Sequence, residues 1–173
     1  MGVRRPALVG IPLLLLALGF SAPEEQPVRV ELIAEHASVQ PGGTTRVGVR
    51  FNIDEGWHIY AKQPGEAGLP TKIAWKGPPG ASFGPFDWPT PQPLKDPGHL
   101  RIFGYTGVVI FASRLRVARA VAAGTTLPIR AKVEWLACKE LCLPGSVDLS
   151  LALPVSANPP VASTHADFFD HAP

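Results

Sequence analysis

Three observations in the sequence predict an all-β protein, an antiparallel β-sandwich. Short runs that alternate apolar and polar residues recur along the chain, turn residues separate them, and the three-to-four-residue periodicity of helices is nearly absent. Proline (20) and glycine (17) exceed a fifth of the 173 residues, and they fall mostly between the apolar runs. This length suits one domain with a proper core and is too short for two ordinary domains.

Seven or eight short strands are expected. In chain order the candidates are 28–39, 46–53, 57–61, 71–77, a short extended piece at 81–86, 107–117, 125–138 and 146–155. The stretch 77–100 is so rich in proline and glycine that we expect little other regular structure there. Residues 116–125 form the only helix-like run, which Gly124 ends.

The N-terminus has the order of a secretory signal. Arg4 and Arg5 precede an apolar run at 7–20, and small residues then lead into a charged segment. A membrane anchor is the alternative, but the run is short of the roughly 20 residues that a bilayer requires. We therefore expect an exported, periplasmic protein with these parts: signal peptide 1–22, linker 23–27, sandwich domain 28–155 and irregular tail 156–173.

Charge excludes one class of function. The net charge is +2, with 17% charged residues, and no run of lysines or arginines is present. Binding to nucleic acid therefore has no electrostatic basis in this sequence.

The only two cysteines, Cys138 and Cys142, lie in the stretch VEWLACKELCLPG. In a helix their Cβ atoms would be about 5–6 Å apart, too far for a relaxed disulfide, which needs about 3.8 Å. In a hairpin between flanking strands they would nearly face each other, and the strands on both sides favour this arrangement. A bridge there closes a very small loop and stabilises the fold little, so it suits reversible exchange.

Other interpretations of the cysteines remain open. They include a structural hairpin disulfide, which persists readily in an exported protein, and half of a zinc site, which would need a second ligand pair. A copper site would need two histidines and usually a methionine, and the only methionine is Met1. Lys139 favours a thiolate while Glu140 opposes one. We expect neither a metal nor a cofactor.

Three motifs in order resemble a known family: GWHIYAKQPGEAGLPTKIAWKGP, FGYTGVVIF and VEWLACKELCLPG. Over residues 28–155 the chain resembles the periplasmic N-terminal domain of the thiol:disulfide interchange protein DsbD and its copper-sensitivity-suppressor relatives. The resemblance implies an immunoglobulin-like sandwich. It also implies electron transfer from a membrane-embedded partner, through a thioredoxin-like domain, to oxidised proteins outside the cytoplasm.

The resemblance also implies a site. Its catalytic pair would be Cys138 and Cys142, at one end of the sandwich on neighbouring strands. A cap loop in RIFGYTG would shield the disulfide, with Tyr105 as the cap aromatic and Phe103 as the alternate. His58 and Tyr60 of GWHIY would flank the pair, and His58 would assist proton transfer if it lies close to the sulfurs.

Two hypotheses follow. The first is an exported thiol:disulfide oxidoreductase in which Cys142 forms mixed disulfides with partners. The second is a non-catalytic sandwich that binds a protein or a metal and carries a fixed disulfide. Copper handling is a variant of either. The best-known members space their cysteines more widely, a departure that concerns the geometry of the disulfide. Because the resemblance ends near residue 155, we expect a stand-alone exchange partner or a domain with another use.

Overall fold

The computed structural model of the chain describes residues 26–95 and 98–170. The described residues form these elements: β1 (Val28–Ala34), β2 (Thr44–Ile53), β3 (His58–Gly65), β4 (Lys72–Lys76), β5 (Ala81–Asp87), β6 (Gln92–Lys95), β7 (Arg101–Tyr105), β8 (Val108–Val117), β9 (Thr126–Cys138), β10 (Cys142–Pro154) and α1 (Asp167–Asp170). In the described part of the chain, no helix has the length and apolar character that a membrane span requires.

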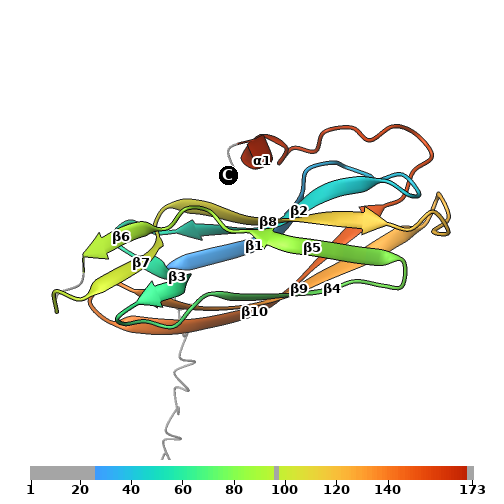
Figure 1. The fold of residues 1–173 in the computed structure, drawn as a ribbon. Helices are drawn as coiled ribbons and strands as arrows, with labels where there is room; N and C mark the ends of the chain where they lie inside the picture. The colour runs from blue at the N-terminus through green and yellow to red at the C-terminus, as the bar shows by residue number, and fades with distance from the viewer. Residues whose placement is uncertain (1–25, 96–97, 171–173) are drawn as a thin grey trace, which may run out of the picture.

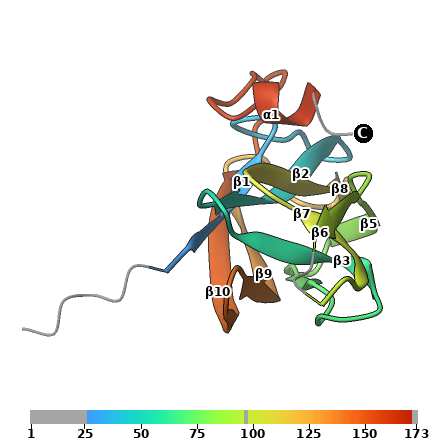
Figure 2. The same ribbon diagram turned by 90° about the vertical axis from the view of Figure 1, so that its left-hand side faces the viewer.

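The strands form two antiparallel sheets that pack face to face. The smaller sheet has the order β1-β2-β8-β5, and the larger has the order β10-β9-β3-β7-β6, with β4 paired to the same edge of β9 as β3. Figure 1 shows β2 and β8 of the smaller sheet above β9 and β10 of the larger one, with β6 and β7 of the larger sheet rising at one end, and Figure 2 shows the arrangement after a quarter turn. The predicted all-β sandwich is thus confirmed.

Alternation along the strands builds the core between the sheets. On β9, Ile129, Ala131 and Val133 are at most 1% exposed, whereas the residues between them face solvent. On the inner face of the smaller sheet, the rings of Phe51 and Phe111 meet edge to face with centroids 5.4 Å apart. This geometry is favourable for aromatic pairs and adds to the stabilisation from their burial.

Strand β9 and its pairing partners determine where the cysteines lie, at one end of the sandwich. It pairs with β10 along its whole length, from Thr126 opposite Pro154 to Cys138 opposite Cys142. Its other edge pairs first with β4 and then, at its last two residues, with β3. The cysteine hairpin is therefore held by neighbours on both edges of one strand.

The proline-rich stretch contains more structure than its composition predicts. Besides β5, it contains β6, which pairs with β7 and places Pro93 on an edge strand. Proline is tolerated there because the outer edge of such a strand has no partner that needs its missing N–H. The helix-like run at 116–125 forms the end of β8 and turns, and Gly124 adopts a positive φ of 86°.

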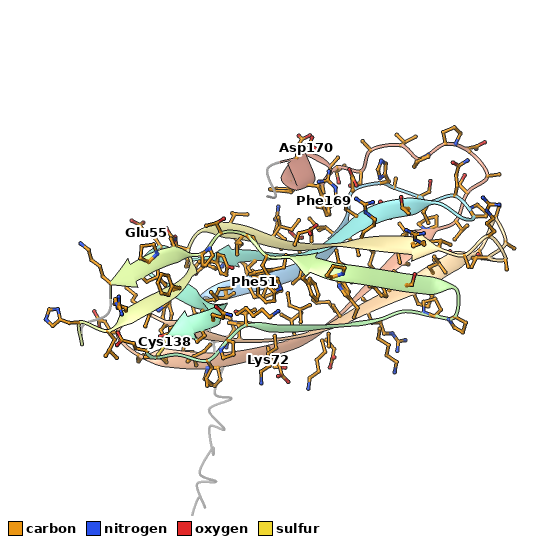
Figure 3. The ribbon with its side chains drawn as sticks, in the orientation of Figure 1. Phe51, Glu55, Lys72, Cys138, Phe169 and Asp170 are labelled. Atoms are coloured by element: carbon orange, nitrogen blue, oxygen red, sulfur yellow. A yellow bond between two sulfur atoms is a disulfide. The ribbon has the colours of Figure 1, made fainter. Side chains whose placement is uncertain are left out.

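The C-terminal segment folds back over the smaller sheet. Phe169 of α1 is fully buried and packs on the outward-facing side chains of Ile33, Ile110 and Ala112. Gly48 provides room for the ring, because a Cβ there would lie 3.3 Å from Phe169 Cε1. Figure 3 shows Phe169 on the opposite side of the sandwich from Cys138.

Arg46 holds this segment in place. Its Nη1 donates a hydrogen bond to the carbonyl oxygen of Phe169 at 2.5 Å, and its Nη2 lies 3.3 Å from the carboxylate of Asp170. The same guanidinium binds Glu35 at 2.8 Å, and this hydrogen bond holds the pKa of the Glu35 carboxyl below its usual value. Arg46 of β2 thus links the residue that follows β1 to the C-terminal segment.

Replacing Phe169 with alanine should lower the free energy of unfolding by about 3–5 kcal/mol, because a fully buried ring is removed from an apolar cluster. Urea denaturation followed by tryptophan fluorescence measures the loss. The control is Phe168→Ala, which removes a half-buried neighbour and should cost less. A loss below about 1 kcal/mol for Phe169→Ala would contradict a stabilising role for the docked segment.

Candidate functional site

The two cysteines end one strand and begin the next. Cys138 is the last residue of β9, Cys142 is the first of β10, and the two are direct register partners joined by a disulfide. Their Cα atoms are 4.1 Å apart. The connecting loop is closed by a hydrogen bond from the Lys139 N–H to the Leu141 carbonyl oxygen at 3.1 Å. The disulfide therefore lies at the tip of a long hairpin, as the flanking strands predict.

The disulfide belongs to the outer face of the larger sheet. Ala137, one residue before Cys138, is 1% exposed and packs in the main core, so Cys138 points the other way. His58, the first residue of β3, is the register partner of Cys138 and shares that face. Its ring centroid is 5.1 Å from that of Tyr60, two residues along the same strand. The structure thus brings His58 and Tyr60 to the cysteine side of the sheet.

A small apolar cluster covers one of the two sulfur-bearing residues. Cys138 is 3% exposed and packs with Tyr60 and Ile102, which are also buried. Ala67, Leu94 and Leu136 pack around these three. Cys142, in contrast, is exposed. A reacting group from solvent therefore meets Cys142 first.

The loop between β3 and β4 closes over Tyr60. Gly68 has a φ of 93°, and a Cβ at this position would lie 2.2 Å from the Tyr60 ring, so only glycine fits this close approach. The Thr71 hydroxyl donates a hydrogen bond to the Tyr60 carbonyl oxygen at 2.7 Å and anchors the end of the loop. The loop thus fixes the tyrosine that covers Cys138.

The structure places Tyr105 on the core side of β7. Its ring packs edge to face on Phe111 with centroids 5.2 Å apart, and its hydroxyl donates to the Pro89 carbonyl oxygen at 2.9 Å. Burial raises the pKa of this hydroxyl, so it stays neutral. Phe103, 38% exposed, shares the Tyr105 face of the strand by alternation. Neither ring is part of the cluster around Cys138.

The residue of β7 that joins the cluster around Tyr60 and Cys138 is Ile102, which the sequence reasoning missed. The pairing of Tyr60 with Gly104 turns Gly104 and Ile102 toward the cysteine face. A Cβ on Gly104 would lie 2.1 Å from the Ile59 carbonyl oxygen, so the glycine permits β7 to approach β3 closely. The alternation in RIFGY puts Ile102 and Gly104 on one face of the strand, but only the register with β3 tells which face that is.

Lys139, the residue after Cys138, packs against the turn that precedes β3. The aliphatic part of Lys139 lies over Gly56 in the β2–β3 turn, where a Cβ would be 2.9 Å from Lys139 Cε. Within residues 26–95 and 98–170, no group of three or more His, Cys, Asp or Glu side chains is arranged to hold a metal ion. The chemistry that this arrangement supports directly is that of the two sulfurs.

The unequal burial of the sulfurs can be tested by alkylation. In the reduced protein, Cys142 should react with iodoacetamide at least about tenfold faster than Cys138, because reaction requires an accessible thiolate. A quenched time course with mass analysis of the two peptides measures both rates. In urea the difference should disappear. Equal rates in the folded protein would contradict the asymmetry.

Solved structures resemble this chain at low sequence identity. The N-terminal periplasmic domain of ScsB from Proteus mirabilis is 19% identical, with a TM-score of 0.62 over 87% of this chain and 55% of that one. The chain therefore spans little more than half the length of that relative. The reduced DsbD N-terminal domain from Neisseria meningitidis is 22% identical, with a TM-score of 0.34 over 76% of this chain and 89% of that one.

A third structure is a complex of the DsbD and PilB N-terminal domains from Neisseria meningitidis. It is 20% identical, with a TM-score of 0.38 over 76% of this chain and 87% of that one. No curated protein matches the chain. The ScsB likeness agrees with the immunoglobulin-like sandwich that the motifs led us to expect, and this fold is confirmed.

The family comparison covers most of the chain. Residues 24–154 match the family described as thiol:disulfide interchange protein DsbD, N-terminal. The match includes both cysteines, His58, Tyr60 and every strand of the sandwich. The chain therefore belongs to the family of the N-terminal domain of the thiol:disulfide interchange protein DsbD, and with its Cys138–Cys142 disulfide it is a thiol–disulfide exchange domain.

Proposed function

We propose that the protein is a thiol:disulfide oxidoreductase of the protein-disulfide reductase type. It passes electrons from a membrane-embedded or thioredoxin-like thiol reductase to oxidised exported proteins. The observation that carries this proposal is the unequal burial of two joined sulfur-bearing residues: Cys138 is 3% exposed and Cys142 is exposed. Access controls the rate of thiol exchange, so this arrangement directs partners to one sulfur and protects the other.

Reduction of the disulfide begins at the exposed sulfur. A donor thiolate attacks Cys142 Sγ, the Cys138–Cys142 bond breaks, and its electron pair stays on Cys138 Sγ. A second donor thiolate then attacks the donor sulfur of the mixed disulfide and releases Cys142 as a thiolate. The donor leaves as a disulfide and the protein holds two reduced cysteines, so two electrons have moved.

The reduced protein passes these electrons on by the reverse steps. The Cys142 thiolate attacks the disulfide of an oxidised protein and forms a mixed disulfide. Cys138 then attacks Cys142 Sγ, which restores the original disulfide and releases the reduced protein. Cys138 acts only within the chain, and this suits its burial under Tyr60 and Ile102.

His58 supplies a proton acceptor and donor beside the buried sulfur. It is the register partner of Cys138 on the same face of the sheet and is half-buried. A thiolate that forms under an apolar cluster is costly unless a neighbouring group neutralises it. Imidazole titrates near ambient pH, so His58 can protonate Cys138 when it leaves and deprotonate it before it attacks.

The oxidised proteins that such a domain reduces are found where disulfides persist. The basic, apolar and small-residue order of residues 1–22 predicts export, and disulfides persist in the bacterial periplasm. We place the mature protein there.

The reduction potential of the Cys138–Cys142 pair should fall between about −120 and −270 mV, the range of exchange proteins. Alkylation of free thiols across a glutathione redox series measures it. With oxidised partner protein, Cys138→Ala should accumulate a mixed disulfide at least about tenfold above the yield of Cys142→Ala. Cys138→Ala keeps the exposed thiol and lacks the one that resolves the mixed disulfide, whereas Cys142→Ala keeps only the buried thiol.

Two results would contradict the exchange function. A potential below about −300 mV would indicate a structural bridge. Unfolding of Cys142→Ala, seen by circular dichroism, would show that the fold depends on the bridge.

Replacing His58 with phenylalanine should slow reduction of the disulfide by a small dithiol about tenfold near pH 7 and remove an inflection from the pH–rate profile, because a proton donor is lost. Stopped-flow measurements between pH 5 and 9 give the profile. His165→Phe is the control, since His165 is also half-buried but lies in the C-terminal segment. An unchanged profile in His58→Phe would rule out proton transfer by this residue.

A further inference from the structure

A pocket of about 330 Å³ opens beside the disulfide. It begins at Pro144, two residues after Cys142 on β10, and it is called the Pro144 pocket below. Its lining consists of Leu69, Pro70, Lys72, Glu134, Trp135, Pro144, Gly145 and Ser146. These residues come from the β3–β4 loop and from three neighbouring strands of the larger sheet.

The register places the pocket on the cysteine side of the sheet. Cys142 pairs with Cys138, Pro144 with Leu136, and Ser146 with Glu134, and alternation turns all three pairs to one face. The next strand continues the last of these rows, because Lys72 pairs with Glu134. Figure 3 shows Lys72 and Cys138 on the same lower sheet. Two residues of strand span roughly 7 Å, so the pocket begins at about that distance along β10 from the exposed cysteine.

Apolar groups form most of its surface. Leu69, which is 62% exposed, forms one of its walls. Pro70 and Pro144 add to this surface, whereas the indole of Trp135 faces the core, where its centroid lies 5.7 Å from that of Phe51. Leu141, 59% exposed in the hairpin loop, extends the apolar surface to the other side of the disulfide.

We propose that the Pro144 pocket binds a large apolar side chain, aromatic or leucine, of the polypeptide that exchanges with Cys142. The proposal rests on the exchange function above and deepens it: a partner of this site presents a large apolar side chain close to its reacting cysteine. The pocket begins two residues from the exposed cysteine on the same face of the sheet, so a polypeptide that reacts with Cys142 passes close to it. Its volume suits one side chain and is small for a folded element.

Binding in the pocket acts on the rate of exchange and not on the redox balance of the protein. The chemical step is unchanged: a partner thiolate attacks Cys142 Sγ, the S–S bond breaks, and the electron pair stays on Cys138. A side chain held in the pocket positions that thiolate for attack and so raises the second-order rate constant. The reduction potential of the free protein stays the same, and small thiols gain nothing.

Rapid-quench kinetics with short reduced peptides test the pocket. Each peptide has one cysteine among glycines and either phenylalanine or alanine two residues before or after it; glutathione serves as the probe without an anchor. With the oxidised protein, the better phenylalanine peptide should form the mixed disulfide at least about tenfold faster than its alanine counterpart, which corresponds to about 1.4 kcal/mol. Glutathione reports the reactivity of the disulfide alone.

Two variants remove the pocket in different ways. Leu69→Ser takes away an exposed apolar wall, and Ser146→Phe fills the pocket from an exposed strand position where an aromatic residue is well tolerated. Both should reduce the phenylalanine-to-alanine ratio to nearly one and leave the glutathione rate unchanged, which also shows that the hairpin is intact. Val161→Ser, at 69% exposure in the C-terminal segment, is the matched control and should keep the full ratio.

The outcomes separate the pocket from the exchange function. If glutathione reacts but the wild-type protein does not distinguish the peptides, the pocket proposal is overturned and the exchange function stands. The pocket proposal also fails if both Leu69→Ser and Ser146→Phe keep the preference. If neither glutathione nor any peptide opens the disulfide, the exchange function fails and the pocket proposal fails with it.

Discussion

The register of β9 against the strands on its two edges is the constraint on which the rest of the structure depends. Residues 129, 131 and 133 fill the core from this strand, so its alternation is fixed by burial. A slip of one residue would exchange the faces of the whole strand and expose that apolar set. Because the core forbids this slip, Cys138 must end β9 on the outer face, opposite both Cys142 and His58. The position of the reactive group follows from packing far from it.

The same register explains why two adjacent sulfurs have different surroundings. Cys138 has strands on both sides, and Tyr60 and Ile102 close over it from there. Cys142 begins β10, the edge strand of the sheet, and has a paired strand on one side only. An edge position is usually a liability in a β-protein, since it invites pairing with other chains. Here the edge provides the access that exchange chemistry needs, and Pro144 next to it limits unwanted strand pairing.

The sequence was sufficient for features that depend on neighbours along the chain. Alternation identified most strands, and the strands around the two cysteines indicated the hairpin. The identity of the residues over Cys138 depends instead on how β7 registers with β3, with Tyr105 opposite Ile59 and Gly104 opposite Tyr60. A motif on one strand cannot reveal this register, and so Ile102 was missed although it lies beside the aromatic residues that the motif singled out. Strand β6 was missed for a related reason, because its pairing with β7 overrides a composition that disfavours strands.

The cluster around Cys138 is separated from the main core by the sheet itself. It contains six residues, Tyr60, Ala67, Leu94, Ile102, Leu136 and Cys138, whereas the large aromatic rings meet on the other side of the strands. Opening the disulfide therefore changes packing in a small compartment and leaves the sandwich interior as it was. By thermodynamic linkage, any difference in stability between the oxidised and reduced forms must also appear in the reduction potential, at about 1.4 kcal/mol for each 30 mV. The packing of these six side chains therefore contributes to the potential of this protein, together with His58 at the register position opposite Cys138.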